Sequence, residues 1–291
     1  MSTLVLYADP AAFLAVAEPV LAADPVGTTV IGAAAQQLAA GLGDQRLQGG
    51  WFATAADTDG RVRGLAMRTG KYPPALHDLS PTTAAELADR VLASGETPDG
   101  AQAQRDSALA FAERVAAATG GEVRVERELR LHRLGTLTPP SGVPGYARRA
   151  TEADLDLLVD WMRAFLIDVG DALPPPAGDE AERRAAETEE QRQRLDHAWL
   201  WIDAAGVPVA LAAGRPPAFG VVRVGPVYTP SNQRGHGYAA AVTAHVSAVA
   251  RDGGSEVVLF TDLANPTSNG VYRRIGFAPV GDRVSVRVVR G

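Results

Sequence analysis

The stretch "PVYTPSNQRGHGYAAAV", from Pro226 to Val242, decides the fold of this 291-residue chain. Gly235 and Gly237 relieve backbone crowding, and the alanine run that begins at Ala239 strongly favours a helix. An apolar segment precedes the glycines, so the stretch predicts a strand, a tight loop and then a helix. The first N–H groups of a helix lack internal partners and attract anions, above all phosphates. The stretch therefore predicts a phosphate-binding loop in an α/β protein.

The elements around this loop are clearly separated in the sequence. Thr151 and Asp154 form a capping pattern that predicts the start of an amphipathic helix, which the short strand "YARR" precedes. Asn265 followed by Pro266 predicts the start of a second, shorter helix that ends before Gly276. The remaining segments are a charged helix over 180–194, the loop helix to Arg251, and the strands "WLWID", "PVALAAGRP", "FGVVRVGPVYT", "EVVLFTDL" and "VSVRVV".

The segment "TLTPPSGVPG", from Thr136 to Gly145, predicts a linker because prolines and glycines interrupt regular structure. We therefore expect two domains, residues 1–141 and 142–291. In the first, "EVRVERELRLHRL" alternates apolar and charged residues as a half-exposed strand does, with one break in phase near Glu126. The other predicted elements there are the strands "WFATAAD" and "VRGLAMRT" and helices near Ala11–Ala22, Gly32–Ala40, Thr82–Ala93 and Asp106–Ala118.

The composition excludes several classes of function. The net charge of −6 argues against nucleic acid as the main partner. The chain has no cysteine, which excludes disulfides and thiolate catalysis, and its five histidines show no metal-ligand spacing. The N-terminus does not resemble a secretory signal, and no segment approaches the ~20 apolar residues that span a bilayer. We expect a cytoplasmic protein without metal or membrane contact.

Two motifs in sequence order resemble the GCN5-related N-acetyltransferase (GNAT) family. The family's pyrophosphate loop, Gln/Arg-x-x-Gly-x-Gly/Ala, is matched by Arg234, Gly237 and Ala239. Its later segment, roughly Asn-x-x-Ala/Ser-x-x-x-Tyr-x-x-x-Gly-Phe, is matched by Asn265, Ser268, Tyr272, Gly276 and Phe277. The resemblance implies the GNAT fold, a mixed and largely antiparallel sheet flanked by helices, and it covers residues from about Tyr146 onward. The first half resembles a degenerate second copy, because no such loop motif follows a strand there.

The resemblance implies an N-acetyltransferase that uses acetyl-CoA as cosubstrate and an amine as acceptor, without a metal. It assigns Tyr272 as the general acid toward the CoA thiolate. The cofactor-binding residues that it implies are Val227, Tyr228, Thr229, Arg234, Gly235, His236, Gly237, Tyr238, Ala239, Asn265, Ser268 and Tyr272. A non-catalytic module that binds or senses acyl-CoA is the alternative with the same loop.

Some assignments stay open at the level of sequence. Asn265 can cap its own helix while it also contacts the cofactor, and Tyr272 can be an aromatic core residue beside Phe277. Asp168, Asp171 and Asp262 are equivalent candidates for a general base. The sequence identifies neither the acceptor nor the oligomeric state, and a homo-oligomer is compatible with it.

Overall fold

The computed structural model describes residues 3–41, 50–70, 72–170 and 178–290. In the first half the strands are β1 (Thr3–Tyr7), β2 (Gly50–Ala56), β3 (Val62–Thr69), β4 (Ala75–His77), β5 (Gly100–Ala103) and β6 (Gly121–Leu134). The helices there are α1 (Pro10–Ala23), α2 (Thr29–Ala39), α3 (Pro81–Ala93) and α4 (Arg105–Thr119).

The second half repeats this order of elements. Its strands are β7 (Tyr146–Arg149), β8 (Ala198–Ile202), β9 (Pro208–Gly214), β10 (Val221–Tyr228), β11 (Glu256–Asp262) and β12 (Phe277–Arg290). Its helices are α5 (Leu155–Asp168), α6 (Glu180–Arg192), α7 (Tyr238–Asp252) and α8 (Pro266–Arg274). Both halves read strand, two helices, three strands, helix, strand, helix, strand. This identity of order supports the prediction of two related units in tandem.

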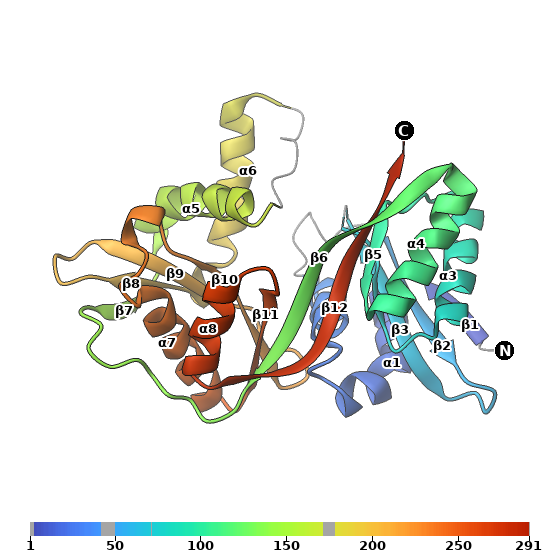
Figure 1. Cartoon of the computed structure of the whole chain (residues 1–291), viewed down its shortest axis with the longest axis horizontal. Coiled ribbons are helices and arrows are strands. Elements are labelled where there is room, and N and C mark those ends of the chain that lie inside the picture. Colours follow the sequence, from blue (N-terminus) through green and yellow to red (C-terminus); the bar gives the residue numbers. More distant parts are fainter. Residues whose placement is uncertain (1–2, 42–49, 71, 171–177, 291) are drawn as a thin grey trace.

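The described strands form one mixed, mostly antiparallel sheet of twelve strands, with β6 and β12 side by side at its centre (Figure 1). The order across the sheet is β1-β2-β3-β4-β5-β12-β6-β11-β10-β9-β8-β7. Each half therefore places its last strand beside the fifth strand of the other half. The linker from Thr136 to Gly145 separates the halves along the chain, but the exchanged strands join them in space.

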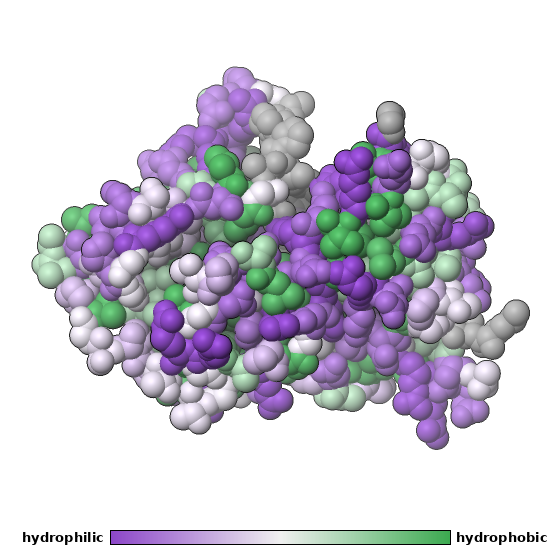
Figure 2. Space-filling view, viewed as in Figure 1, coloured by the Kyte–Doolittle hydropathy of each residue, from purple (hydrophilic) through white to green (hydrophobic). Residues whose placement is uncertain are grey.

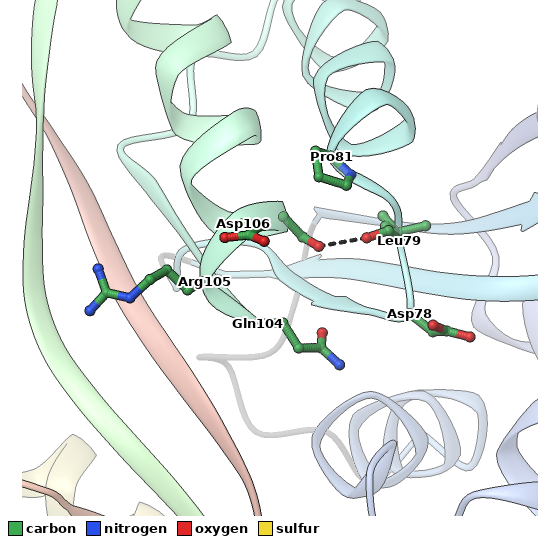
Figure 3. A pocket seen from close by; sticks show the side chains of 7 residues that line it. Asp78, Leu79, Pro81, Gln104, Arg105 and Asp106 are labelled. Carbon is green, nitrogen blue, oxygen red and sulfur yellow. Dashed lines mark hydrogen bonds between the residues drawn. The ribbon is translucent and has the colours of Figure 1, made fainter.

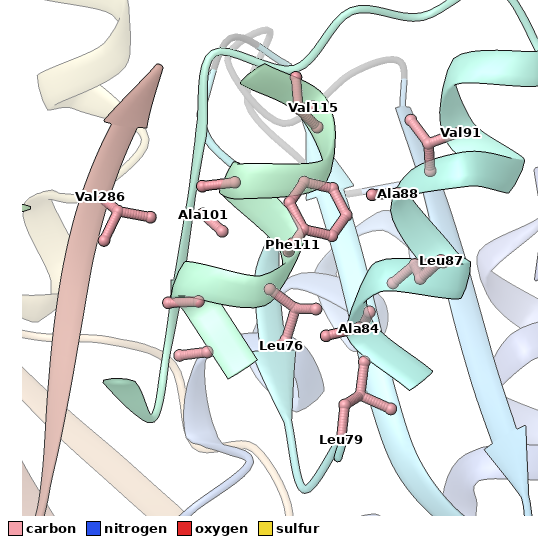
Figure 4. Packing of buried hydrophobic residues seen from close by; sticks show 14 of the residues in the cluster. Leu76, Leu79, Ala84, Leu87, Ala88, Val91, Ala101, Phe111, Val115 and Val286 are labelled. Atoms are coloured by element: carbon pink, nitrogen blue, oxygen red, sulfur yellow. The ribbon is translucent and has the colours of Figure 1, made fainter. Parts of the chain in front are cut away.

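The exchange completes the hydrophobic core of each half. Phe111 of α4 and Leu87 of α3 are fully buried in a cluster to which β12 adds Val286 (Figure 4). In the second half, the core under α7 and α8 includes Leu134, the last residue of β6. Neither core is complete without the other half.

Local sequence signals explain where several elements begin and bend. Thr151 and Asp154 form the predicted capping box, and the ion pair with Arg148 is the main cause that lowers the pKa of Asp154 to about 2. The predicted break in phase at Glu126 is a bulge, since Arg127 pairs with Ser285 while Val125 pairs with Val286. The short strands β1, β4 and β5 have no counterpart among the predicted elements.

Helix α6 is attached to α5 mainly by charge. Its one buried residue is Gln191, and its arginines reach carboxylates on neighbouring segments. These ion pairs are Arg184 with Asp156 and Asp160, Arg192 with Glu152, and Arg163 of α5 with Glu180 and Glu187. Figure 2 shows the resulting hydrophilic surface over this helix. Among the described helices, none is long and apolar enough to cross a membrane.

Candidate functional site

The connection from β10 to α7 is a backbone cradle formed by two glycines. Gly235 and Gly237 have φ angles of +86° and +83°, in the left-handed region that favours glycine. Gly237 is the N-cap of α7, and no side chain caps this helix end. Among the described residues, no partner is found for the N–H groups from Gly235 to Ala239. These donors, together with the helix dipole, make the loop suited to an anion.

The two glycines differ in the space around them. A Cβ atom on Gly235 would meet no heavy atom within 4 Å, so this residue faces open space. A Cβ atom on Gly237 would lie 3.0 Å from Cγ2 of Val143, a residue of the linker. Gly235 is therefore the better position at which to test the loop without disturbing its packing.

Arg234 is held on both sides by the protein itself. Its Nε donates to the carbonyl oxygen of Thr229 over 3.0 Å, and its Nη2 donates to Oδ2 of Asp168, the last residue of α5. The positive charge of Arg234 at the loop is thus shared with a carboxylate. Of the other two candidate bases, Asp262 accepts the N–H of Ala264 with one oxygen, and Asp171 lies outside the described residues.

The aromatic residues of the loop are arranged as a stack. The exposed ring of His236 lies nearly parallel to that of Tyr238, with 5.5 Å between the centroids, and Nδ1 of His236 is 3.2 Å from the carbonyl oxygen of Gln233. The Tyr238 ring is buried in the second core, whereas Ala239 is half-buried. His236 is exposed and has no acidic partner among the described residues.

Strands β10 and β11 part in front of this loop. They pair in parallel from Val221 to Arg223, and no pairing continues beyond Arg223 with Val258. From there β11 pairs with β6, while β10 stays beside β9 with a register shift between Val224 and Val227. A wedge opens between the two strands toward Val227, Tyr228 and Thr229. Oγ1 of Thr229 is buried there without a partner among the described residues.

Helix α8 begins as the sequence predicts. Asn265 is the N-cap and accepts the N–H of Ser268 over 3.1 Å, Pro266 is the first helical residue, and Oγ of Ser268 donates to the Asn265 carbonyl oxygen. Capping by Asn265 is therefore confirmed, and a contact with the cofactor stays a prediction.

Tyr272 lies on α8 at the edge of the second core. Its ring is half-buried and meets Phe277 edge-on, with 6.1 Å between the centroids. Burial raises the pKa of Tyr272 to about 12. Its hydroxyl has no hydrogen-bond partner among the described residues. The ring is thus a core residue beside Phe277, as one interpretation of the sequence has it, and the role of Tyr272 as general acid stays a prediction.

A hydrogen-bond chain that sequence reasoning missed fixes the first turn of α8. The Asn269 amide donates to the carbonyl oxygens of Asp262 and Asn265 over 2.9 and 2.8 Å, and its oxygen accepts the Thr261 hydroxyl over 2.6 Å. Nε2 of His132 lies 2.9 Å from the same hydroxyl. Because the Thr261 proton is donated to Asn269, Nε2 of His132 must be the donor.

His132 comes from β6, so the first half supports the helix that carries Tyr272. Burial lowers the pKa of His132, which keeps the imidazole neutral. No periodic pattern could reveal this chain of contacts, because its three side chains come from β6, β11 and α8.

The corresponding position in the first half has a different construction. Only Asp78, Leu79 and Ser80 connect β4 to α3, and Ser80 caps α3 by accepting the N–H of Thr83 over 3.1 Å. Figure 3 shows the shallow pocket at this place, where the hydroxyl of Ser107 donates to the carbonyl oxygen of Leu79. The described first half thus has no glycine loop between these two elements.

Comparisons with known proteins agree with this geometry. Residues 158–277 match the family model described as "Acetyltransferase (GNAT) family". The match spans the wedge, the glycine loop and α8. The chain therefore carries a GNAT acetyltransferase domain, and acyl transfer is the general activity of that family.

Solved structures resemble the whole chain. A GCN5-related N-acetyltransferase from Sphaerobacter thermophilus has a TM-score of 0.59 at 18% identity, with 99% of this chain and 96% of that chain covered. A GNAT-family acetyltransferase from Colwellia psychrerythraea has a TM-score of 0.57 at 12% identity, covering 99% and 100%.

A tandem GNAT protein from the clavulanic acid biosynthesis pathway has a TM-score of 0.54 at 13% identity, covering 99% and 98%. At these identities the likeness establishes the GNAT fold alone. No curated protein matches the chain in sequence.

Proposed function

We propose that the chain is an acetyl-CoA-dependent N-acetyltransferase whose active site lies in residues 142–291. The observation that carries the proposal is one juxtaposition. The loop from Gly235 to Ala239, whose N–H groups have no partner among the described residues, includes Tyr238, which packs in one cluster with Val227 of the wedge and Tyr272 of α8. The first unit, residues 1–141, would bind no acetyl-CoA, because a three-residue connection with its own cap replaces the loop.

The residues at the loop fit a pyrophosphate. Gly235 has neither a side chain nor a protein neighbour to fill the space that it faces, and the N–H donors behind it are unpaired among the described residues. The wedge offers strand edges to an extended pantetheine arm, as a peptide would pair with an open edge. The residues that would hold the cosubstrate are Val227, Tyr228, Thr229, Arg234, Gly235, His236, Gly237, Tyr238, Ala239, Asn265, Ser268 and Tyr272.

When acetyl-CoA is bound, its thioester supplies the acetyl group. The acceptor amine attacks the thioester carbonyl directly, and main-chain donors of β10 near Val227 stabilise the developing oxyanion. Tyr272 donates its proton to the departing sulfur, for which a phenol that is fully protonated at neutral pH is suited. Since the chain has no cysteine, no thiol of the protein takes part. The proposal assigns no side chain as general base, since Asp168 is engaged by Arg234, and the proton that the amine loses passes to water.

Removing the Tyr272 hydroxyl distinguishes the hypothesis of an enzyme from that of a non-catalytic acyl-CoA sensor. Tyr272→Phe removes the proton donor but keeps the ring on Phe277. We expect acetyl-CoA affinity to stay within about twofold and thiol release to an amine acceptor to fall by roughly 10²–10⁴. Tyr7→Phe, a half-buried tyrosine of the first half that bonds to Thr54, is the matched control and should leave both values unchanged.

Calorimetric binding and a thiol-release assay on the same preparations measure both quantities. Full activity of the Tyr272→Phe enzyme would remove the phenol from the mechanism. Acetyl-CoA binding by the native chain without turnover of any amine would favour the sensor.

A further inference from the structure

Arg223 of β10 lies opposite Arg215, the residue that follows β9. Val224 pairs with Gly214, and the N–H of Arg215 donates to the carbonyl oxygen of Arg223 over 2.9 Å, so the two arginines are cross-strand neighbours. Val222 and Val224 point toward α7, and Arg223 between them points to the opposite face because strand residues alternate. That face carries α5 and, through Val26, the α1–α2 connection of the first half.

Arg223 lies at the closed end of the wedge. It is the last residue of β10 to pair with β11, opposite Val258, and the strands part immediately after it. The side chains nearest in register on this face are apolar: Val221 and Val258 belong to a buried cluster, and Phe260 packs against it. Arg223 is the one charged residue of β10, so a molecule that reaches the closed end of the wedge from this face meets its guanidinium.

The charge of Arg223 is not balanced by any residue that the structure describes. Its guanidinium has no hydrogen bond or ion pair with any described residue, whereas Arg148, Arg163 and Arg184 of the same half each reach a carboxylate. Burial, followed by the positive charge of Arg215, lowers the pKa of Arg223 to about 9. Like charges directly opposite each other destabilise a sheet, and a half-buried cation without a counter-ion adds a desolvation cost. Such a residue weakens the free protein, and a bound anion would compensate for it.

We propose that Arg223 binds an oxyanion, a carboxylate or a phosphate, carried by the acceptor amine. Guanidinium groups recognise both oxyanions through paired N–H donors. The acceptor would place its anionic group against Arg223 and its amine farther along the wedge, toward Val227. This inference rests on the proposed function, since it names the class of acceptor for the same site.

The kinetic test uses acceptors that share an amine and differ in the anion. Glycine is compared with glycinamide, and phosphoethanolamine with ethanolamine, in the thiol-release assay. The native enzyme should prefer one anionic member by about 10–100-fold in kcat/KM, and the preferred pair tells carboxylate from phosphate. Arg223→Met should abolish that preference through KM and leave the KM for acetyl-CoA unchanged. Arg124→Met, at an exposed arginine of β6, is the control.

Two readouts do not depend on catalysis. Calorimetric titration with N-acetylglycine and with inorganic phosphate should detect binding of one of them to the native chain, weakened at least about tenfold in Arg223→Met. In the ligand-free protein, Arg223→Met should leave the melting temperature unchanged or raise it, because it removes an unpaired charge.

The outcomes separate this inference from the proposed function. Acetylation of amines without preference for an anion, or a melting temperature several degrees lower in Arg223→Met, would overturn the inference and leave the acetyltransferase standing. Anion binding that requires Arg223, without any acetyl transfer, would support the anion site and overturn the proposed function. Absence of both binding and preference overturns the anion site.

Discussion

At the scale of single residues, Tyr272 shows how one side chain serves both the fold and the proposed chemistry. The ring fills the edge of a core with Phe277, and the same burial disfavours the phenolate. An exposed phenol would ionise near pH ~10, well within reach of alkaline buffers. The protein environment, rather than a hydrogen-bond partner, is what keeps this donor protonated.

The ionisation of Tyr272 can be followed directly. Burial raises the pKa of Tyr272 in the folded protein to about 12, above its value of ~10 in the unfolded chain. The stability that the buried neutral phenol contributes is therefore complete below pH ~10 and is lost as the pH rises from there through the folded-state pKa. The ultraviolet difference spectrum between the native protein and Tyr272→Phe should show no phenolate signal up to about pH 11. A phenolate transition with a midpoint near pH ~10 would contradict the proposed environment.

The sequence predicted single residues well where chemistry is local. Asn265, Pro266 and Gly276 at the ends of α8 follow from capping rules, and so does the pair of Thr151 and Asp154. Partners far apart in the chain were not predicted: nothing in the sequence ties Arg234 to Asp168, or His132 to Thr261. Those contacts depend on which strands become neighbours.

At the scale of elements, α8 is positioned more by polar contacts than by packing. None of its residues is fully buried, and its first turn is fixed by the amide of Asn269. The helix that carries the proposed general acid therefore depends on one side chain and on the Thr261–His132 contact behind it. This dependence gives the exchanged strand β6 a part in shaping the site.

Replacing Asn269 should loosen this helix. Asn269→Leu removes one hydrogen bond from the Thr261 hydroxyl and one from each of two carbonyl groups, at a cost of about 1–3 kcal/mol in the free energy of unfolding. Urea unfolding measures the cost, and amide hydrogen exchange should show faster exchange in α8 while α7 stays protected. Equal protection of α8 in the variant and the native protein would show that packing alone holds the helix.

Element prediction failed for short strands. β1, β4 and β5 span few residues, too few for an alternating pattern to stand out, and β4 pairs with β5 at a single register position, Ala75 with Gln102. Strongly capped helices were predicted, and so was the break in phase near Glu126, but of the long strand β12 only 284–289 was predicted.

At the scale of the whole molecule, the two halves exchange their last strands. Periodicity predicts strands over 122–134 and 284–289, but not which strand each one joins, since pairing partners are chosen by the packing of complete layers. The linker from Thr136 to Gly145 predicts a domain boundary along the sequence. In the structure, residues on either side of it share one sheet, with β6 against β11 and β12 against β5.

We expect the halves to unfold together. Phe111→Ala removes a fully buried ring from the first core and should cost about 3–5 kcal/mol. In a Trp51→Phe background the remaining tryptophans, Trp161, Trp199 and Trp201, all lie in the second half. Their fluorescence transition in urea should shift as far as the circular dichroism transition. A tryptophan transition that stays in place would show that the second half is stable without the first.

The most direct test of the central claim is calorimetric titration of acetyl-CoA into three proteins: native, Gly235→Glu and Gly254→Glu. Gly235 and Gly254 stand near opposite ends of α7, with φ angles of +86° and +80°. A Cβ atom at either position would have no neighbour within 4 Å, so both substitutions carry similar backbone strain.

We predict one site per chain in the native protein and in Gly254→Glu, and affinity at least about 100-fold weaker in Gly235→Glu, since several charge-assisted contacts are lost. Equal binding by Gly235→Glu and Gly254→Glu, or no binding by the native protein, would contradict a pyrophosphate site at this loop.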